Sequence, residues 1–301
     1  MRQQRDPATP AQTILSRPST AATERVTASM TAKRDEQVVQ QDTADEPVAG
    51  PEPKLRVTDL RAGFGEREVL HGISVSFPAN TITALIGPTG CGKSTFLRTL
   101  NRLNDLVAGF HWSGQIELDG LDVNRQVSDV RELRRRVGML FQRPNPFPQS
   151  IRANIAIGLR THRIVSRGAV EQQVQRQLEE VGLWDAVHDK LDASPFGLSG
   201  GQQQLLCLAR TLAVQPEVIL LDEPTSSLDP ISTQRVEDLL RRLKERITII
   251  MVTHNLQQAS RIADRVVFLY DGRLVETDEA EEFFLRPKNK LTEDFITGRI
   301  G

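Results

Sequence analysis

The residues with the most evident chemistry lie at 87–94, where the sequence reads GPTGCGKS. This segment fits the pattern GxxxxGK followed by Ser or Thr; it follows an apolar stretch, Ile82–Ile86, and precedes a helix-forming run at 94–100. Glycines let backbone N–H groups converge on phosphate oxygens, and the N-terminus of a helix adds positive potential. Lys93 would then reach the β- and γ-phosphates, and the Ser94 hydroxyl would ligate Mg²⁺. The segment predicts a phosphate-binding loop for a nucleotide.

A pair of carboxylates, Asp222 and Glu223, ends the apolar run at 218–221. An apolar residue at every position is expected of a strand that is buried on both faces of a sheet. Ligands of open α/β sheets bind at the carboxyl ends of such strands, so we expect Asp222 to hold Mg²⁺ through water. Glu223 would polarise the attacking water. A pair that only caps a strand before Pro224 is the alternative, and the phosphate-binding loop upstream favours the catalytic interpretation.

A third polar element, LSGGQ at 198–202, precedes a helical run at 203–212. The Ser199 hydroxyl, the glycine amides and the helix dipole would form a second anion site. The first two elements alone would suit a GTPase, a kinase or a helicase. The third element distinguishes between these classes, because one chain then carries two half-sites for a single γ-phosphate.

The elements that must position these residues follow a simple order. Short β-rich pieces with Gly, Asn and Asp-Gly turns come first and suggest an antiparallel sheet beside a central one; they lie at 55–57, 73–77, 82–86, 115–118 and 137–141. Residues 151–214 have a helical pattern, with apolar side chains at Val170, Val174, Leu178 and Val181. A strand at 218–221, a helix at 231–244 and a strand at 247–253 then predict a parallel sheet with crossover connections.

Composition limits the class of protein further. The 38 basic and 39 acidic side chains nearly cancel, so nothing in the charge predicts a nucleic-acid partner. No apolar run approaches the ~20 residues that cross a bilayer. The two cysteines, Cys91 and Cys207, lie far apart without the spacing of a zinc site or a disulfide framework, which is typical of a reducing compartment. Residues 1–53 lack aromatic residues and apolar periodicity and predict a disordered extension. A targeting peptide is the less favoured alternative, because Asp6 and Glu24 interrupt the early arginines and no apolar core follows.

An LSGGQ segment between a phosphate-binding loop and a strand that ends in Asp-Glu resembles the signature of ABC transporter ATPases. The resemblance covers residues 54–301 and implies an α/β fold of the P-loop NTPase class, namely an ABC ATPase domain. Such a domain has a mixed central sheet with a RecA-like core, an antiparallel β subdomain and a helical signature subdomain, here at about 143–214. In that family the signature of one protomer closes over ATP held by the other, which implies a homodimer with ATP and Mg²⁺ as cofactors.

The resemblance also assigns roles to single residues. Gln142 matches the glutamine that senses Mg²⁺ and the attacking water, and Asp229 matches the D-loop aspartate. His254 matches the switch histidine, although a lone histidine after a strand is more often structural. Phe64 stands where the family has an aromatic side chain that stacks on adenine, and core packing would explain it as well. The expected catalytic residues are Glu223, His254 and Gln142; the expected metal ligands are Ser94, Gln142 and Asp222; the expected nucleotide contacts are Phe64, Gly87, Pro88, Thr89, Gly90, Cys91 (through its backbone amide), Gly92, Lys93, Ser94, Thr95, Ser199, Gly200, Gly201, Gln202 and Asp229.

A finer resemblance is to the ATP-binding subunits of bacterial phosphate importers. It rests on ALIGPTGCGKSTFLRTLNRLND at 84–105, FQRPNPFPQS at 141–150, LSGGQQQ at 198–204, DPIST at 229–233, THNLQQ at 253–258 and TEDFITGRIG at 292–301. It implies two integral membrane permease subunits, a periplasmic or surface phosphate-binding protein and a peripheral position on the cytoplasmic face of the cell inner membrane. Leu205 departs from the family, which commonly has arginine there. The proline-rich loop at 144–148 either docks the membrane subunits or forms a rigid surface turn.

Three other functions remain as alternatives. An importer ATPase for another solute would share every motif, because such systems select solutes in their other subunits. A soluble ABC ATPase that acts on DNA or ribosomes is disfavoured, because the segment between Ser94 and Leu198 is too short for a long coiled coil and the chain has one cassette. A nucleotide-binding module without activity is disfavoured by Glu223, Gln142 and His254.

Overall fold

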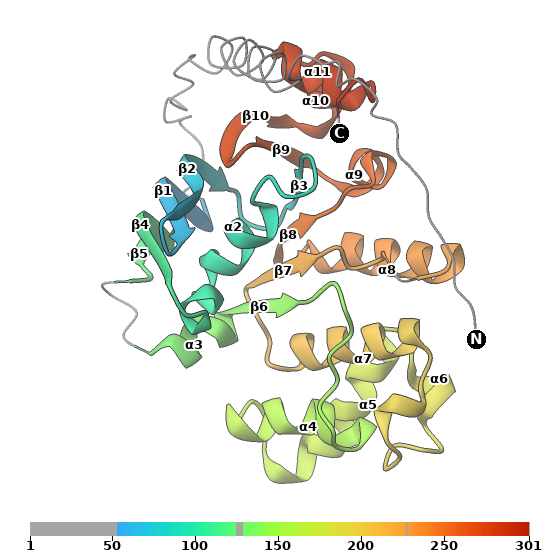
Figure 1. The fold of residues 1–301 in the computed structure, drawn as a ribbon. Helices are drawn as coiled ribbons and strands as arrows, with labels where there is room; N and C mark the ends of the chain where they lie inside the picture. The colour runs from blue at the N-terminus through green and yellow to red at the C-terminus, as the bar shows by residue number, and fades with distance from the viewer. Residues whose placement is uncertain (1–52, 125–128, 227, 301) are drawn as a thin grey trace, which may run out of the picture. The chain divides into compact units, whose positions relative to one another are not determined.

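The computed structural model describes residues 53–124, 129–226 and 228–300. The N-terminal extension expected at 1–53 therefore lies, except for Pro53, outside the described residues. Within the described part the chain forms two sheets and a separate group of helices. Figure 1 shows the smaller sheet on the left, the larger one in the centre and the helices α4–α7 below.

The smaller sheet is antiparallel and has the strand order β2-β1-β4-β5. Its strands are β1 (Leu55–Phe64), β2 (Arg67–Phe77), β4 (Phe110–Leu118) and β5 (Leu121–Asp122). The antiparallel sheet expected from the sequence is confirmed, but β1 and β2 are longer than the pieces at 55–57 and 73–77. The apolar alternation in β1 is interrupted near Asp59, whose φ of 45° accompanies an irregularity in register, and this break hides the continuation of the strand.

The central sheet has the order β10-β9-β3-β8-β7-β6, and all of its pairs are parallel except that of β10 with β9. The strands are β3 (Ile82–Ile86), β6 (Val137–Leu140), β7 (Val218–Asp222), β8 (Thr248–Val252), β9 (Arg265–Tyr270) and β10 (Arg273–Glu279). Every residue of β3, β7 and β8 is buried, as expected of parallel strands covered on both faces. The loops that follow β3, β6, β7 and β8 lie at the carboxyl edge of the sheet, where all the motif residues except the signature and Phe64 occur.

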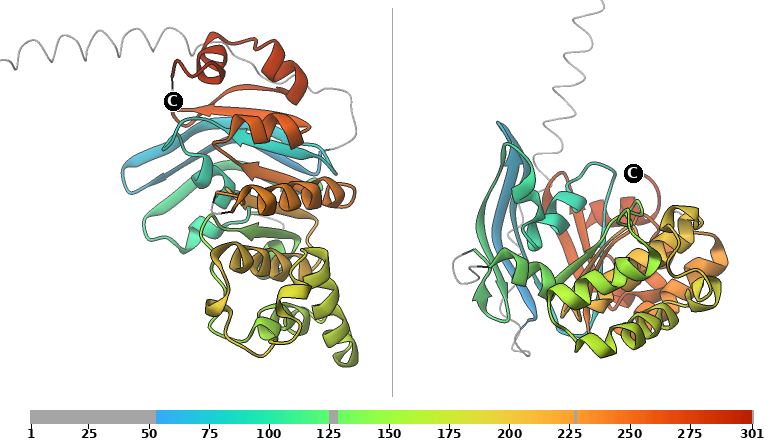
Figure 2. Two further views of the ribbon diagram at one scale, coloured as in Figure 1. Left: turned by 90° about the vertical axis from the view of Figure 1, so that its right-hand side faces the viewer. Right: turned by 90° about the horizontal axis from the view of Figure 1, so that it is seen from below.

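Helix α2 (Lys93–Leu100) lies between the two sheets, as the view from below in Figure 2 shows. Its apolar side chains Phe96, Leu97 and Leu100 are fully buried in a core that contains residues of both sheets. Helices α8 (Pro230–Leu243) and α9 (Leu256–Ile262) follow β7 and β8, and α10 (Ala280–Leu285) and α11 (Lys290–Ile296) follow β10. The short α3 (Val130–Arg136) precedes β6. The core therefore fixes the start of α2, and with it the phosphate-binding loop, against the central sheet.

The remaining helices are α4 (Ile151–Thr161), α5 (Val170–Glu180), α6 (Trp184–Val187) and α7 (Gly200–Ala213). They confirm the helical pattern expected at 151–214, and Val170, Val174, Leu178 and Val181 are all buried in one core with α4 and α7. Helix α7 begins three residues earlier than predicted, because the Ser199 side chain caps it. Leu205 packs against the same core, so the departure from arginine is accommodated as an apolar contact. No described helix is long and apolar enough to cross a membrane.

Candidate nucleotide-binding and catalytic site

The loop between β3 and α2 has a backbone that depends on glycine. Gly87 has a φ of 146°, and a Cβ there would lie 2.0 Å from the carbonyl oxygen of Leu269. Gly92 has a φ of 103°, and its Cβ would lie 2.8 Å from the Leu70 side chain. A Cβ on Gly90, in contrast, would meet nothing within 4 Å, so the middle of the loop faces open space. The loop is therefore fixed at both ends and leaves room for a phosphate in its centre.

The Lys93 side chain folds back over this loop. Its Nζ donates hydrogen bonds of 2.7 Å to the carbonyl oxygens of Gly87 and of Pro88, and it is 8% exposed. The ammonium group thus lies beside the open centre of the loop, and its partners among the described residues are two carbonyl oxygens and the Cys91 sulfur, not a carboxylate. Cys91 Sγ lies 3.8 Å from Nζ, and burial raises the pKa of this thiol, so the side chain stays neutral. This agrees with the expected roles, in which Lys93 supplies the cation and Cys91 contributes its backbone N–H.

Asp222 and Ser94 meet at the start of α2. Ser94 Oγ donates to Asp222 Oδ1 at 3.0 Å, and the other carboxylate oxygen accepts from Arg98 Nη2 at 3.0 Å. The described residues contain no group of three or more His, Cys, Asp or Glu side chains that could hold a metal alone. One hydroxyl and one carboxylate suit Mg²⁺, which takes few protein ligands and completes its shell with water and substrate phosphates. The donor set therefore fits the ion that the sequence predicts.

Glu223 is held between two other predicted residues at the end of β7. Gln142 Nε2 donates to Glu223 Oε2 at 2.7 Å, and His254 Nδ1 lies 3.3 Å from the same oxygen. Glu223 has a φ of 48°, in the left-handed region that non-glycine residues seldom adopt. Its N–H donates to the Val252 carbonyl at 3.0 Å, which anchors the turn after β7 to the end of β8. The backbone thus directs Glu223 away from Asp222, and the strain is of a kind that concentrates at functional sites.

The signature residues lie elsewhere, at the start of α7. The Ser199 side chain accepts from Gln202 N, and the Gln202 side chain accepts from Ser199 N, which forms a capping box. A Cβ on Gly201 would lie 3.1 Å from the Leu228 side chain, so the signature lies beside the D-loop of its own protomer. Asp229 caps α8, and hydrogen bonds, first from the Ser232 side chain, lower its pKa. Within the described part of the chain the Ser199 side chain bonds to Gln202 and not to the phosphate-binding loop.

Phe64 ends β1, and its ring lies against that of Phe110 with the centroids 5.2 Å apart. The next residue, Gly65, donates from its N–H to the Gly109 carbonyl at 2.9 Å. Phe64 is half-buried, so one part of the ring packs and the other remains accessible. Both interpretations of this residue are consistent with its position, and stacking on adenine stays a prediction. Thr95 lies in the first turn of α2 beside Ser94, as predicted.

Three residues that the sequence analysis did not single out also serve the site. Arg98 pairs with Asp222, and its position one helical turn after Ser94 is the signal that could have found it. Gln204 Nε2 donates to the Phe141 carbonyl at 2.9 Å and so fixes the end of β6 just before Gln142. Arg210 donates to the backbone and side-chain oxygens of Asn145 at 2.9 and 2.8 Å, and its guanidinium lies 4.2 Å from the Phe147 ring centroid. Arg210 thereby orders the proline-rich loop at 144–148, on which Phe147 is 40% exposed.

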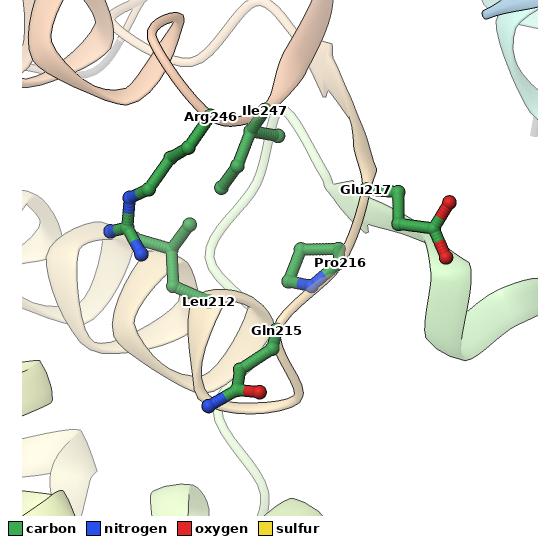
Figure 3. A pocket seen from close by; sticks show the side chains of 6 residues that line it. All are labelled: Leu212, Gln215, Pro216, Glu217, Arg246 and Ile247. Atoms are coloured by element: carbon green, nitrogen blue, oxygen red, sulfur yellow. The ribbon is translucent and has the colours of Figure 1, made fainter.

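A pocket occurs at the opposite edge of the central sheet. It is lined by residues that precede β7 and β8 and by the end of α7, namely Leu212, Gln215, Pro216, Glu217, Arg246 and Ile247 (Figure 3). Figure 3 shows the Glu217 carboxylate directed away from Gln215 and Arg246, and it is paired with Arg136 at 2.7 Å. Arg246 is paired with Glu180. The charged groups of this pocket are therefore occupied, and it contains none of the predicted site residues.

The geometry agrees with comparisons to known proteins. A family model described as ABC transporter matches residues 70–226, and the chain therefore belongs to the ABC transporter family. It is 55% identical over 249 residues to "Phosphate import ATP-binding protein PstB 2" of Mycobacterium tuberculosis (strain ATCC 25618 / H37Rv), covering 83% of this chain and 90% of that protein. The protein of the same name from Mycobacterium bovis (strain ATCC BAA-935 / AF2122/97) matches equally. The chain is thus an ABC ATP-binding subunit.

A solved structure of a bacterial Atm1-family ABC exporter with ATP bound has the same fold, with a TM-score of 0.71 and 26% sequence identity. The match covers 92% of this chain and 48% of the exporter chain, so this chain spans about half the exporter's length. The predicted fold class is confirmed: a mixed central sheet, an antiparallel β subdomain and a helical subdomain that carries the signature.

Proposed function

We propose that this chain is the ATP-hydrolysing subunit of an ABC importer of inorganic phosphate. The observation that carries the proposal is the position of Glu223, whose carboxylate contacts Gln142 and lies beside His254, next to the Asp222–Ser94 pair. That arrangement supports hydrolysis and not binding alone, because a carboxylate beside the γ-phosphate position can polarise water. The 55% identity to phosphate-import ATP-binding proteins supports phosphate as the solute.

The residues of the chain divide the chemistry between them. The amides of the loop after β3 and the Lys93 ammonium bind the phosphates, and Glu223 accepts a proton from the attacking water. Gln142 and His254 orient the Glu223 carboxylate through the contacts at 2.7 and 3.3 Å. Ser94 and Asp222, with Gln142, would hold Mg²⁺, which neutralises charge on the phosphates when it is bound. Phe64 offers the accessible part of its ring to adenine.

Two copies of the chain complete each site in this proposal. Ser199, Gly200, Gly201 and Gln202 form an exposed helix N-terminus that would contact the γ-phosphate held by the partner's phosphate-binding loop. Asp229 lies beside this segment and would reach across the same interface. The assembly would be a head-to-tail homodimer with two composite ATP sites, which is a closed arrangement with twofold symmetry.

An importer of this kind needs further subunits, as the similarity to an ATP-binding protein for phosphate import indicates. We assign two integral membrane permeases as partners, and a phosphate-binding protein outside the membrane as the solute receptor. The chain would then lie peripherally on the cytoplasmic face of the cell inner membrane. The ordered loop at 144–148, with its exposed Phe147 directly after Gln142, is the surface that would pass motion to the permeases. We assign residues 54–301 to the ATPase domain and about 143–214 to its helical subdomain.

The proposal is tested by phosphate uptake in a strain that lacks its own ATP-binding subunit. The wild-type chain should restore uptake of labelled phosphate, whereas Glu223→Gln should not. Purified Glu223→Gln should keep ATP affinity within about twofold but lose at least about a hundredfold in turnover, because the amide cannot accept the proton. It should also accumulate as an ATP-bound dimer in size-exclusion chromatography.

The outcomes separate the alternatives. Wild-type turnover in Glu223→Gln would contradict the catalytic assignment. ATP hydrolysis with no restored phosphate uptake, but with uptake of another solute, would indicate an importer of that solute. Co-purification with ribosomes or DNA instead of membrane subunits would indicate a soluble ABC ATPase.

A further inference from the structure

A buried amide connects the two loops that carry Glu223 and His254. Gln258, in the first turn of α9, is 1% exposed, although glutamine is usually a surface residue. Its side chain forms hydrogen bonds to three residues from three different segments, which are Thr253, Thr225 and Glu237. A buried amide with every bond satisfied is characteristic of a network that holds one conformation.

The first branch of this network reaches the histidine loop. Thr253 Oγ1 donates to Gln258 Oε1 at 3.0 Å, and the same hydroxyl accepts from Asn255 N at 3.0 Å. Thr253 and Asn255 are the neighbours of His254 on either side, so this one hydroxyl fixes the backbone around the histidine. The His254 side chain is 65% exposed, and few contacts other than Glu223 would hold its ring.

The second branch reaches the turn that carries Glu223. Gln258 Nε2 donates to Thr225 Oγ1 at 2.9 Å, two residues after Glu223. The same nitrogen donates to Glu237 Oε1 at 3.1 Å. Glu237 lies on α8, is fully buried, and is neutralised by Arg261 Nη2 at 2.7 Å. Gln258 therefore ties the Glu223 turn, the His254 loop and helix α8 to one another.

Only an amide satisfies this geometry. Oε1 must accept from Thr253 while Nε2 donates to Thr225 and to the Glu237 carboxylate. A carboxylate at this position would place two like charges about 3 Å apart in a buried site, and an apolar side chain would remove all three hydrogen bonds that join the segments. The network thus depends on the amide and not merely on the volume of the side chain.

From these contacts we infer that Gln258 is a positioning residue for hydrolysis, which keeps His254 and Glu223 at their working separation. The inference rests on the proposed function, since it assumes that those two side chains act on ATP. The side-chain hydrogen bonds of Gln258 to the described residues reach neither the phosphate-binding loop nor Lys93, so its effect is on geometry and not on nucleotide binding.

The test compares Gln258→Leu and Gln258→Glu with the wild type. Each should lower kcat at least about tenfold, because a shift of about 1 Å in a reacting group can cost a hundredfold. KM and the affinity for ATP in EDTA should change less than about twofold, since the phosphate-binding loop is untouched. The double variant Glu237→Gln/Gln258→Glu exchanges amide and carboxylate and should restore kcat to within about threefold of the wild type.

Gln177→Leu provides a control. Gln177 is also a buried amide, 7% exposed, but it lies on α5 in the group of helices α4–α7, and its Oε1 has no hydrogen-bond partner among the described residues. This variant should change the melting temperature little, because the lost oxygen was unpaired, and should leave kcat per folded molecule unchanged. Activities are normalised to the folded fraction measured by circular dichroism.

The outcomes are distinct. Wild-type kcat in folded Gln258→Leu, or failure of the double variant to restore a kcat lost in Gln258→Glu, would overturn the positioning role and leave the proposed function intact. An inactive wild-type chain would instead contradict the proposed function itself.

Discussion

The two halves of the predicted ATP site differ in how complete they are within one chain. The half around Glu223 is linked internally: Gln142 and His254 contact Glu223, and Ser94 and Arg98 contact Asp222. In the signature half Ser199 and Gly200 are exposed, and within the described residues the side chains of Ser199 and Gln202 bond to each other's backbone. The first half is assembled by the fold of one protomer, and the second presents a capped helix N-terminus.

This difference assigns separate tasks to the two halves. A preassembled cluster can bind and orient nucleotide without large reorganisation, which is how electrostatic stabilisation is made efficient. An exposed helix N-terminus adds positive potential only when an anion is brought to it. In the proposed function the chain supplies one complete half-site and one that would act on a second copy, so hydrolysis would depend on dimer formation.

The largest effect on turnover should come from substitutions that inactivate the two halves of the site in different protomers. A Cβ on Gly200 would meet nothing within 4 Å, and an acidic residue is favourable in the first turn of a helix, so Gly200→Asp should fold. It should repel the partner's γ-phosphate and lower turnover at least about a hundredfold. Lys93→Ala should lower turnover to a similar extent, because the phosphates lose their cation.

Mixing the two inactive variants tests whether the halves act in trans. A mixed dimer retains one site with both an intact Lys93 and an intact Gly200, so the mixture should regain about a quarter of wild-type turnover from random pairing. The measurement is steady-state phosphate release from a titration of one variant with the other. A mixture as inactive as its components would show that each chain needs its own signature, which would remove the distinction between the halves.

The elements of the catalytic half could be predicted from the sequence, but the contacts between them could not. The strand Ile82–Ile86, the loop after it and the buried strand before Asp222 follow from local patterns, because glycine spacing and continuous apolar runs are local. Gln142 and Glu223 are 81 residues apart, and their meeting depends on β6 and β7 being neighbours in the sheet. Nothing in the sequence around either residue encodes that pairing.

Supporting residues were missed for the same reason. Arg98 could be placed by helical spacing from Ser94, but its partner Asp222 lies 124 residues away. Gln258 lies in the same sequence motif as His254, and the motif indicates a role for the histidine alone. The role of Gln258 follows only from its contact with Glu237, which is buried on another helix. The ends of β1 and β2 were underestimated because turns of positive φ interrupt their alternation.

A smaller effect should sharpen the claim that the catalytic half is preassembled. Arg98→Leu removes the partner of Asp222 Oδ2 and leaves a carboxylate that is only 3% exposed with Ser94 alone. We expect a loss of about 2 kcal/mol in the free energy of unfolding, the usual range for hydrogen bonds to charged groups. Urea unfolding measures it in the absence of nucleotide.

Arg131→Leu is the matched control for that measurement. Arg131 also pairs with an aspartate, Asp129, but their side chains are 86% and 51% exposed. Exposed pairs contribute little, so the free energy of unfolding should change far less than it does in Arg98→Leu. Equal effects of the two substitutions would mean that the Arg98–Asp222 contact adds nothing to the stability of the site.

The smallest effect should come from the other end of the strand that carries Asp222. Glu217, directly before β7, accepts hydrogen bonds from Arg136 and from Lys54. The Arg136 bond is the largest cause, and together with the Lys54 bond it outweighs the opposing effect of burial and lowers the pKa of Glu217 from 4.5 to about 2. A carboxyl with a lowered pKa stabilises the fold fully above its unfolded pKa and loses that contribution as the pH falls through the folded pKa. Glu217→Gln should therefore flatten the fall in stability between about pH 4.5 and pH 2, which urea unfolding at several pH values would detect. Because the Glu217 side chain is 36% exposed, solvent screening keeps the effect small.

Turnover at neutral pH should be unchanged in Glu217→Gln, since the Lys54–Arg136–Glu217 network lies at the amino end of β7. A loss of turnover would instead show that this network is coupled to the catalytic residues at the carboxyl end of the same strand.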